Sequence, residues 1–232
     1  MHVDVCDSVR VSLDPKPIAN VIVFGGLRPQ GGYVVPAFEF VKSFTDLRFN
    51  VIFIRDLSQR WFNFGIKGFS LDMADTAEQL RYQIDTRFDR SLPLYTVGNS
   101  AGGYGAIYFG EVLGADTVLA MVPQTMIDLN VLARFGHAGW EQMGKFQAIV
   151  PNLRAVMTGK AARVHIVVGK HSPEDVIHAG NLAGCENVYI EIMDGKHDVG
   201  RRWQKEEGGL ARKIADRLIP RQRIGSENLD FK

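Results

Sequence analysis

The chain of 232 residues has little cysteine and no excess of either charge. Its two cysteines, Cys6 and Cys185, are too few for a disulfide framework. One disulfide is compatible with this number, but two free thiols in a reducing compartment fit it better. The 27 basic and 26 acidic residues leave a formal net charge of +1. The composition therefore gives no support for a nucleic-acid partner.

Long apolar runs are missing as well. No run approaches the roughly 18 residues that a membrane-spanning helix needs, and the first residues lack the basic and apolar regions of a secretory signal. We therefore expect a cytoplasmic protein without a membrane partner. Residues 98–103 are rich in glycine but lack the lysine of a phosphate-binding loop, and no metal-ligand spacing is visible. The sequence thus predicts neither a cofactor nor a metal.

The remaining composition is typical of a folded protein. Hydrophobic residues make up 46% of the chain and charged residues 23%, which suits a sizeable buried core. The length suits one domain, which we expect over residues 1–224, followed by a flexible tail over 225–232. The oligomeric state cannot be read from this sequence.

Short apolar runs alternate along the chain with amphipathic stretches. Strands are predicted over residues 18–24, 50–54, 94–97, 117–122, 164–168 and 188–192, and helices over 38–44, 74–88, 101–113 and 208–218. This alternation predicts an α/β fold with a doubly wound, mostly parallel sheet, whose functional residues gather at the carboxyl ends of the strands. The long connection over 126–158 predicts a small helical cap over the site.

A nucleophile elbow is the most informative motif of the chain. Gly98, Asn99, Ser100, Ala101 and Gly102 follow one predicted strand and open a predicted helix. This context is the one that a G-x-S-x-G elbow requires, because the serine sits on a tight, strained turn that small flanking residues permit. Ser100 is therefore the predicted nucleophile.

A serine nucleophile needs a base within hydrogen-bond reach. The chain offers six histidines: His2, His137, His165, His171, His178 and His197. Of these, His197 lies in a polar loop between the last strand and the last helix, from which it can reach over the elbow. We expect His197 to be the base; the alternative is an exposed loop histidine.

The acid that orients the base is expected between serine and histidine in chain order. The segment after the strand 164–168 offers Glu174 and Asp175. Asp175 is the favoured candidate, because Glu174 is explained by the first turn of a helix after Pro173. Asp128 is a third candidate, since it follows an earlier strand.

The oxyanion of acyl transfer requires two backbone N–H donors. Ala101, directly after the nucleophile, is the first candidate. Leu27 is the second, because Gly25 and Gly26 allow the backbone to approach closely. The alternative for these glycines is a tight turn at the end of a strand without a catalytic role. The aromatic residues Trp61, Phe62, Phe64, Phe69, Trp140 and Phe146 are read either as an acyl pocket or as core.

With the order Ser100, Asp175, His197, the chain resembles the α/β-hydrolase fold superfamily over about residues 18–218. Three stretches, at residues 56–65, 98–124 and 175–179, also resemble a bacterial subfamily often found near polysaccharide or glycoconjugate genes. Many relatives place histidine-glycine before the oxyanion donor, where this chain has Gly25-Gly26. Many also place the acid three residues after the strand-end glycine, where this chain has Ser172.

The resemblance implies a serine-dependent hydrolase of a carboxylic ester or thioester, whose partner is a small-molecule substrate. An acyltransferase on a glycoconjugate or another alcohol acceptor would use the same acyl-enzyme. A non-catalytic binding module of the same fold is the alternative from another class.

Overall fold

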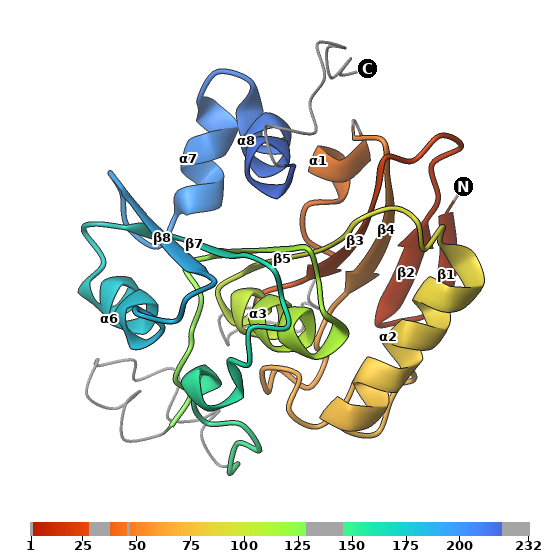
Figure 1. Ribbon diagram of the computed structural model, residues 1–232, viewed down its shortest axis with the longest axis horizontal. Helices are drawn as coiled ribbons and strands as arrows, with labels where there is room; N and C mark the ends of the chain where they lie inside the picture. The colour runs from red at the N-terminus through yellow and green to blue at the C-terminus, as the bar shows by residue number, and fades with distance from the viewer. Residues whose placement is uncertain (1, 28–37, 46, 129–145, 220–232) are drawn as a thin grey trace.

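A twisted sheet of eight strands runs through the molecule (Figure 1). The computed structural model describes residues 2–27, 38–45, 47–128 and 146–219. The strands lie in the order β1-β2-β4-β3-β5-β6-β7-β8. Their bounds are β1 His2–Cys6, β2 Val9–Ser12, β3 Ala19–Phe24, β4 Phe49–Ile54, β5 Leu94–Asn99, β6 Thr117–Met121, β7 Val164–Gly169 and β8 Val188–Met193.

The strands from β3 to β8 are parallel, and the predicted doubly wound α/β sheet is confirmed. Strands β1 and β2 were not predicted. They form an antiparallel ribbon that joins the sheet beside β4. Both are short, and only β2 has a clearly buried face, so their alternation gives a weak signal in the sequence.

Helices cover both faces of the sheet (Figure 1). Their bounds are α1 Val41–Thr45, α2 Met73–Arg87, α3 Ala101–Leu113, α6 Pro173–Asn181, α7 Val199–Lys205 and α8 Gly209–Leu218, with a 3-10 turn η1 at Leu153–Val156. Two apolar clusters result. One joins α2, α3 and α6 to one face through residues such as Leu80, Ile107 and Ala179, and the other joins α1, α7 and α8 to the opposite face through Phe44, Trp203 and Ile214.

One predicted helix begins later than expected. Helix α1 starts at Val41, whereas the apolar pattern predicts a start at residue 38. Phe40 has a left-handed φ of 61°, which a regular right-handed helix does not accommodate. Its carbonyl accepts from the Phe44 N–H at 3.0 Å, so the residue closes a turn ahead of the helix.

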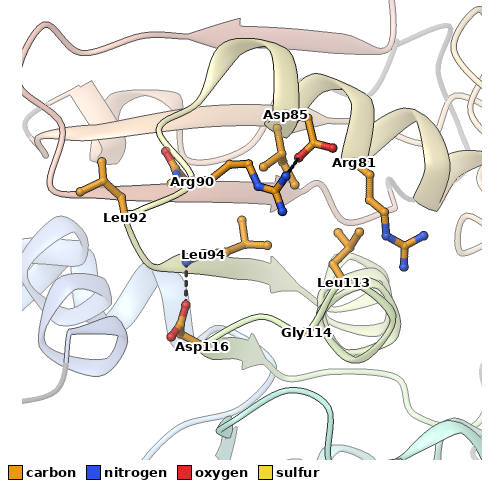
Figure 2. A pocket seen from close by; sticks show the side chains of 10 residues that line it. Arg81, Asp85, Arg90, Leu92, Leu94, Leu113, Gly114 and Asp116 are labelled. Carbon is orange, nitrogen blue, oxygen red and sulfur yellow. Dashed lines mark hydrogen bonds and ion pairs between the residues drawn. The ribbon is translucent and has the colours of Figure 1, made fainter.

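The amino and carboxyl ends of the parallel strands differ in the residues that they bring to the surface. At the amino end, a cavity of about 350 Å³ lies between α2, α3 and the starts of β3 and β5 (Figure 2). Its walls include Arg81, Arg90, Leu94 and Asp116, with no serine, cysteine or histidine among its lining residues. The residues predicted to act chemically all lie at the carboxyl end.

The predicted cap falls mostly on residues 129–145, which lie outside the described residues, as does the predicted tail over 225–232. The two described ends of the cap segment meet at an isolated bridge between Met126 and Asn152. Within the described part of the chain, no helix has both the length and the apolar character to cross a bilayer.

Candidate active site

Strand β5 and helix α3 meet at Ser100 in a tight turn that leaves no room for side chains at Gly98 and Gly102. Ser100 has φ 57° and ψ −120°, a conformation that costs a non-glycine residue about 1–3 kcal/mol. A Cβ added to Gly98 would lie 2.0 Å from the Gly102 carbonyl oxygen, and one added to Gly102 would lie 2.1 Å from that of Phe24. Both positions therefore require glycine, and the small residues predicted around the nucleophile have this steric cause.

The loop after β8 carries His197 and is folded against the end of β7. The Gly195 carbonyl accepts from the His171 N–H at 2.8 Å. A Cβ on Gly169 would lie 2.3 Å from the Lys196 carbonyl oxygen, so the close crossing of the two loops depends on that glycine. The Asp198 carboxylate accepts from the Lys196 N–H at 3.1 Å and closes the turn around the histidine.

Helix α6 carries Asp175 in its first turn, after Pro173. A carboxylate at this position is stabilised by the positive end of the helix dipole. The Asp175 residue is only 3% exposed, and one of its oxygens, Oδ1, lies 2.7 Å from His197 Nδ1. No donor of the described residues reaches its buried Oδ2 within hydrogen-bond distance. The negative charge of Asp175 is thus directed mainly at His197.

These three side chains form a continuous hydrogen-bonded chain. His197 Nε2 lies 3.1 Å from Ser100 Oγ, within the range of a hydrogen bond. Partial burial lowers the pKa of His197, but the hydrogen bond and charge of Asp175, together with the charges of Glu174 and Asp198, outweigh it and raise this pKa above 6.5. A neutral His197 in this position can accept the Ser100 proton.

The backbone around Ser100 also presents donors. The Ser100 N–H is already bonded to the Met121 carbonyl at 2.9 Å, so Ala101 supplies the first uncommitted N–H at the start of α3. In the loop after β3, the Gly25 N–H is bonded to Ile54, which leaves Gly26 and Leu27 as the next donors. A Cβ on Gly26 would lie 3.7 Å from Ser100 Cβ, so this loop borders Ser100.

Other candidates lie elsewhere. Asp128 is exposed after β6, whereas the Nδ1 hydrogen bond of His197 goes to Asp175. Glu174 accepts from the Ser172 hydroxyl at 3.4 Å and affects His197 only through its charge.

The aromatic residues divide between the core and the surface. Trp61 and Phe62 are buried core residues, and Phe64 is 39% exposed. Phe69 is partly buried against the core, and Phe146 contacts Trp61 and Phe64, whereas Trp140 lies outside the described residues.

The sequence analysis named residues 56–65 but did not predict the contacts that hold this loop after β4. Buried Asp56 accepts from the N–H groups of Arg60 and Phe62, and it holds Trp61 and Phe62 in left-handed conformations with φ of 52° and 63°. Trp61 Nε1 in turn donates to Gln124 Oε1 at 2.7 Å. The contact of Trp61 with Gln124 spans distant segments and therefore leaves no local signal in the sequence.

Solved structures share this arrangement of strands and helices. The capsule O-acetyltransferase of Neisseria meningitidis serogroup A has a TM-score of 0.64 and 14% identity, over 85% of this chain and 87% of that one. FphF, a fluorophosphonate-binding serine hydrolase of Staphylococcus aureus, has a TM-score of 0.60 and 13% identity over 91% and 92%. The carboxylesterase EstE1 from a metagenomic library has a TM-score of 0.55 and 15% identity over 95% and 88%.

The protein has the α/β-hydrolase fold. No family model matches the sequence, and neither does any curated protein. In an open, doubly wound sheet, successive strands are added first in one direction and then in the other, and ligands bind at the carboxyl ends of the two strands where the direction changes. Here these two strands are β3 and β5, where the loop with Gly26 meets Ser100.

Among the described residues, no group of three or more histidine, cysteine or acidic side chains is placed to hold a metal ion.

Proposed function

We propose that the protein is a serine hydrolase that cleaves a carboxylic ester or thioester. The observation that carries this proposal is the hydrogen-bonded chain from Ser100 through His197 to Asp175. The strained φ of Ser100 supports it, because backbone strain of this kind persists where the surrounding structure enforces it and clusters at active sites.

The reaction follows from the positions of these groups. Ser100 Oγ attacks the acyl carbon and its proton passes to His197 Nε2, while the N–H groups of Ala101 and Leu27 hold the oxyanion. The bond to the leaving group then breaks, and the departing alcohol or thiol takes the proton from His197. Water attacks the acyl-enzyme and gives a proton to His197, which returns it to Ser100 as the carboxylic acid leaves.

A fluorophosphonate probe tests this proposal directly, because it reacts with activated serines. We expect the wild type to be labelled at Ser100 by peptide mapping, and the variants Ser100→Ala and His197→Ala to lose the label. The matched control is His171→Ala, since His171 also lies in a loop at this edge but bonds to Asp194 instead. Absence of label on the folded wild type, or full esterase activity of Ser100→Ala, would refute the proposal in favour of a binding module.

Acyl transfer is the second candidate, favoured by the structural similarity to the capsule O-acetyltransferase. Both reactions share the acyl-enzyme on Ser100 and differ in whether water or an alcohol removes the acyl group. A transferase is expected to divert the acyl group to a saturable alcohol acceptor, with a matching decrease in the free acid. A hydrolase forms the free acid at a rate that the acceptor leaves unchanged.

A further inference from the structure

A cavity of about 520 Å³ lies beside the catalytic histidine, between the segment before α1, the end of β5 and helix α7. His197 forms part of its wall. The polar residues that share this wall are Glu39, Asn99, Asp198, Arg201 and Gln204. Its volume is within the range of small-molecule sites, about 300–1,000 Å³. We call it the α7 cavity.

Glu39 brings a carboxylate to the edge of the α7 cavity nearest the nucleophile. A Cβ placed on Gly26 would lie 3.3 Å from Glu39 Oε1, 2.9 Å from the Asn99 carbonyl oxygen and 3.7 Å from Ser100 Cβ. Glu39 Oε1 and the backbone carbonyl of Asn99 therefore both border Gly26, in the loop that lies against Ser100. The left-handed Phe40 follows Glu39 directly, so a strained residue sets the direction of the chain at this point.

The wall chemistry favours an uncharged ligand that both donates and accepts hydrogen bonds. Glu39 and Asn99 offer acceptors, the exposed Arg201 offers donors, and the exposed Gln204 offers both. Asp198 is already engaged by the Lys196 N–H and by Arg202 at 3.4 Å. Phe40 and Leu210 add apolar surface of the kind on which a sugar ring packs. Several hydroxyl groups on one ring can both donate to and accept from these groups, whereas a hydrocarbon chain can form no hydrogen bond with them.

The position of His197 indicates which part of the ester substrate lies in the α7 cavity. Its Nε2 returns the Ser100 proton to the leaving group, so the leaving oxygen must lie near this nitrogen. The remainder of that alcohol then extends into the α7 cavity. We propose that the α7 cavity binds a polyhydroxylated alcohol, such as a sugar, as the leaving group of the ester, with Glu39 and Gln204 determining specificity. This inference rests on the proposed function.

In this step the Ser100 Oγ–carbonyl carbon bond forms and the bond from that carbon to the sugar oxygen breaks. The sugar oxygen takes the proton that His197 removed from Ser100, so the sugar departs as a neutral alcohol. If the enzyme transfers acyl groups, the reverse step uses the same cavity for the acceptor.

Two acetate esters with matched leaving groups test the proposal. Methyl 6-O-acetylglucoside and cyclohexylmethyl acetate share the acyl group and a primary oxygen on a six-membered ring, and they differ in hydroxyl content. Each hydrogen bond between the sugar ring and the cavity should raise kcat/KM by a factor of about 2–12. We therefore expect kcat/KM to be at least about tenfold higher for the sugar ester. Equal values, or a preference for cyclohexylmethyl acetate, would overturn the proposal.

Variants locate the preference in the cavity. Glu39→Gln and Gln204→Ala are each expected to decrease the ratio of the two kcat/KM values by about three- to tenfold. Gly200→Leu narrows the cavity, because a Cβ on Gly200 already lies 3.9 Å from the Phe40 ring, and it is expected to abolish the preference. The control is Lys205→Ala on the same helix, outside the cavity lining, with an unchanged ratio. A preference that survives all three cavity variants would contradict the assignment.

Failure of this inference differs from failure of the proposed function. If fluorophosphonate labels Ser100 but the two esters react equally, the serine is active and the α7 cavity does not select sugars. If the folded protein is not labelled and releases no acid from either ester, the proposed function itself is wrong.

Discussion

At the scale of single residues, the geometry of the candidate site depends on glycines where two backbones cross. Gly98 and Gly102 lie in the elbow, and Gly169 lies where the histidine loop passes the end of β7. None of these three has a positive φ, so the requirement is close approach and not backbone conformation. A methyl group at any of them would displace a backbone segment that positions either Ser100 or His197.

Gly102→Ala is therefore expected to destabilise the protein strongly. Its Cβ would lie 2.1 Å from the Phe24 carbonyl oxygen, so β3 and α3 must separate, at a cost of about 3 kcal/mol or more in the free energy of unfolding. Urea denaturation measures this change. The matched control is Gly180→Ala in α6, whose Cβ meets no atom within 4 Å and which should be neutral or stabilising by about 0.5–1 kcal/mol. A Gly102→Ala protein as stable as the wild type would contradict the steric reading.

The charge of Asp175 is expected to appear in the pH dependence of the reaction. His197 must be neutral to accept a proton, and its pKa is raised above 6.5, so kcat/KM should rise with pH through a value above 6.5. Asp175→Asn removes the carboxylate that accepts from His197 Nδ1 and also its charge, which should shift this acidic limb to lower pH and decrease kcat by about 10⁴-fold.

The measurement is the pH profile of kcat/KM, with a direct titration of His197 by NMR. Glu174→Gln is the control, because Glu174 adds only its charge and should shift the His197 pKa less. A wild-type acidic limb below pH 6, or an unchanged limb in Asp175→Asn, would argue against Asp175 as the group that orients His197.

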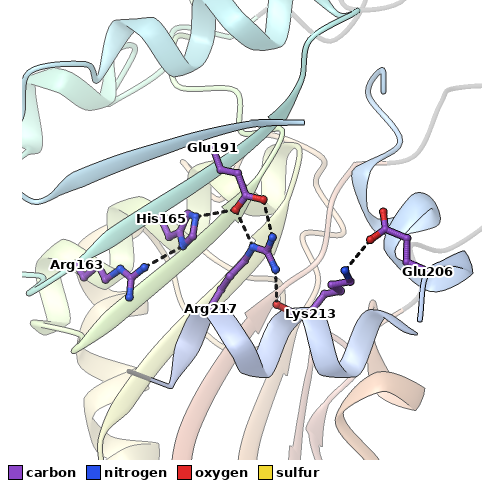
Figure 3. A network of polar contacts seen from close by, with 6 residues as sticks. All are labelled: Arg163, His165, Glu191, Glu206, Lys213 and Arg217. Atoms are coloured by element: carbon purple, nitrogen blue, oxygen red, sulfur yellow. Dashed lines mark hydrogen bonds and ion pairs between the residues drawn. The ribbon is translucent and has the colours of Figure 1, made fainter. Parts of the chain in front are cut away.

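At the scale of elements, an ion-pair network joins the last helix to the edge strand (Figure 3). Glu191 on β8 accepts two hydrogen bonds from Arg217 of α8, at 2.6 and 2.9 Å, and lies 3.1 Å from His165 Nε2 on β7. The Arg217 guanidinium also lies 4.2 Å from the centre of the Trp203 ring. The network thus ties α7 and α8 to the strand that leads into the His197 loop.

Glu191→Gln should show that this network stabilises the fold in a pH-dependent manner. The hydrogen bond with His165, followed by the hydrogen bonds and charge of Arg217, overcomes the opposing effect of burial and lowers the pKa of Glu191 to about 2 from 4.5. A lowered carboxyl pKa contributes stability that is present above pH 4.5 and is lost as the pH falls toward 2. Because the side chain is 34% exposed, solvent screening limits the expected loss to about 1 kcal/mol at pH 7.

The measurement is the free energy of unfolding in urea at pH 7 and pH 2.5, and the difference between wild type and Glu191→Gln should shrink at the lower pH. Asp216→Asn removes the exposed pair with Arg212 on the same helix and should cost less than about 0.5 kcal/mol. A deficit for Glu191→Gln that is the same at both pH values would point to packing instead of charge.

At the scale of the whole molecule, the sheet holds together the three segments that carry the site. Ser100, Asp175 and His197 follow β5, β7 and β8, and β6 lies between β5 and β7. Buried Glu111 adds a second connection, because its carboxylate joins α3 to the N–H groups of Thr158 and Lys160 and to the Asn187 side chain. The distance from serine to histidine is therefore a property of the folded sheet.

Reactivity of Ser100 should consequently be lost together with the fold. We expect the urea midpoint for fluorophosphonate labelling to coincide with the midpoint for the loss of far-UV circular dichroism, as in a cooperative transition. Labelling that disappears well before the circular dichroism would mean that a site loop opens locally while the sheet persists.

Much of the fold followed from local patterns. Apolar β-branched runs predicted the strands from β3 to β8, and the glycines around Ser100 predicted a turn between strand and helix, since both signals lie within a few neighbouring residues. The late start of α1 at Val41, after the left-handed Phe40, and the ribbon of β1 and β2 were not predicted. Both depend on packing against residues far away in the chain.

The elbow could be predicted from sequence alone, because Gly98, Ser100 and Gly102 lie within five residues, although the steric limit on Gly102 comes from Phe24 of β3. The choice of Asp175 over Asp128 as the residue beside His197 was decided only by tertiary structure, as was the approach of Glu39 to Gly26. Such contacts depend on strand order and register, which the sequence specifies only through the packing of the entire core. Local sequence thus predicted Ser100 as the nucleophile, and the folded sheet determined which residues lie beside it.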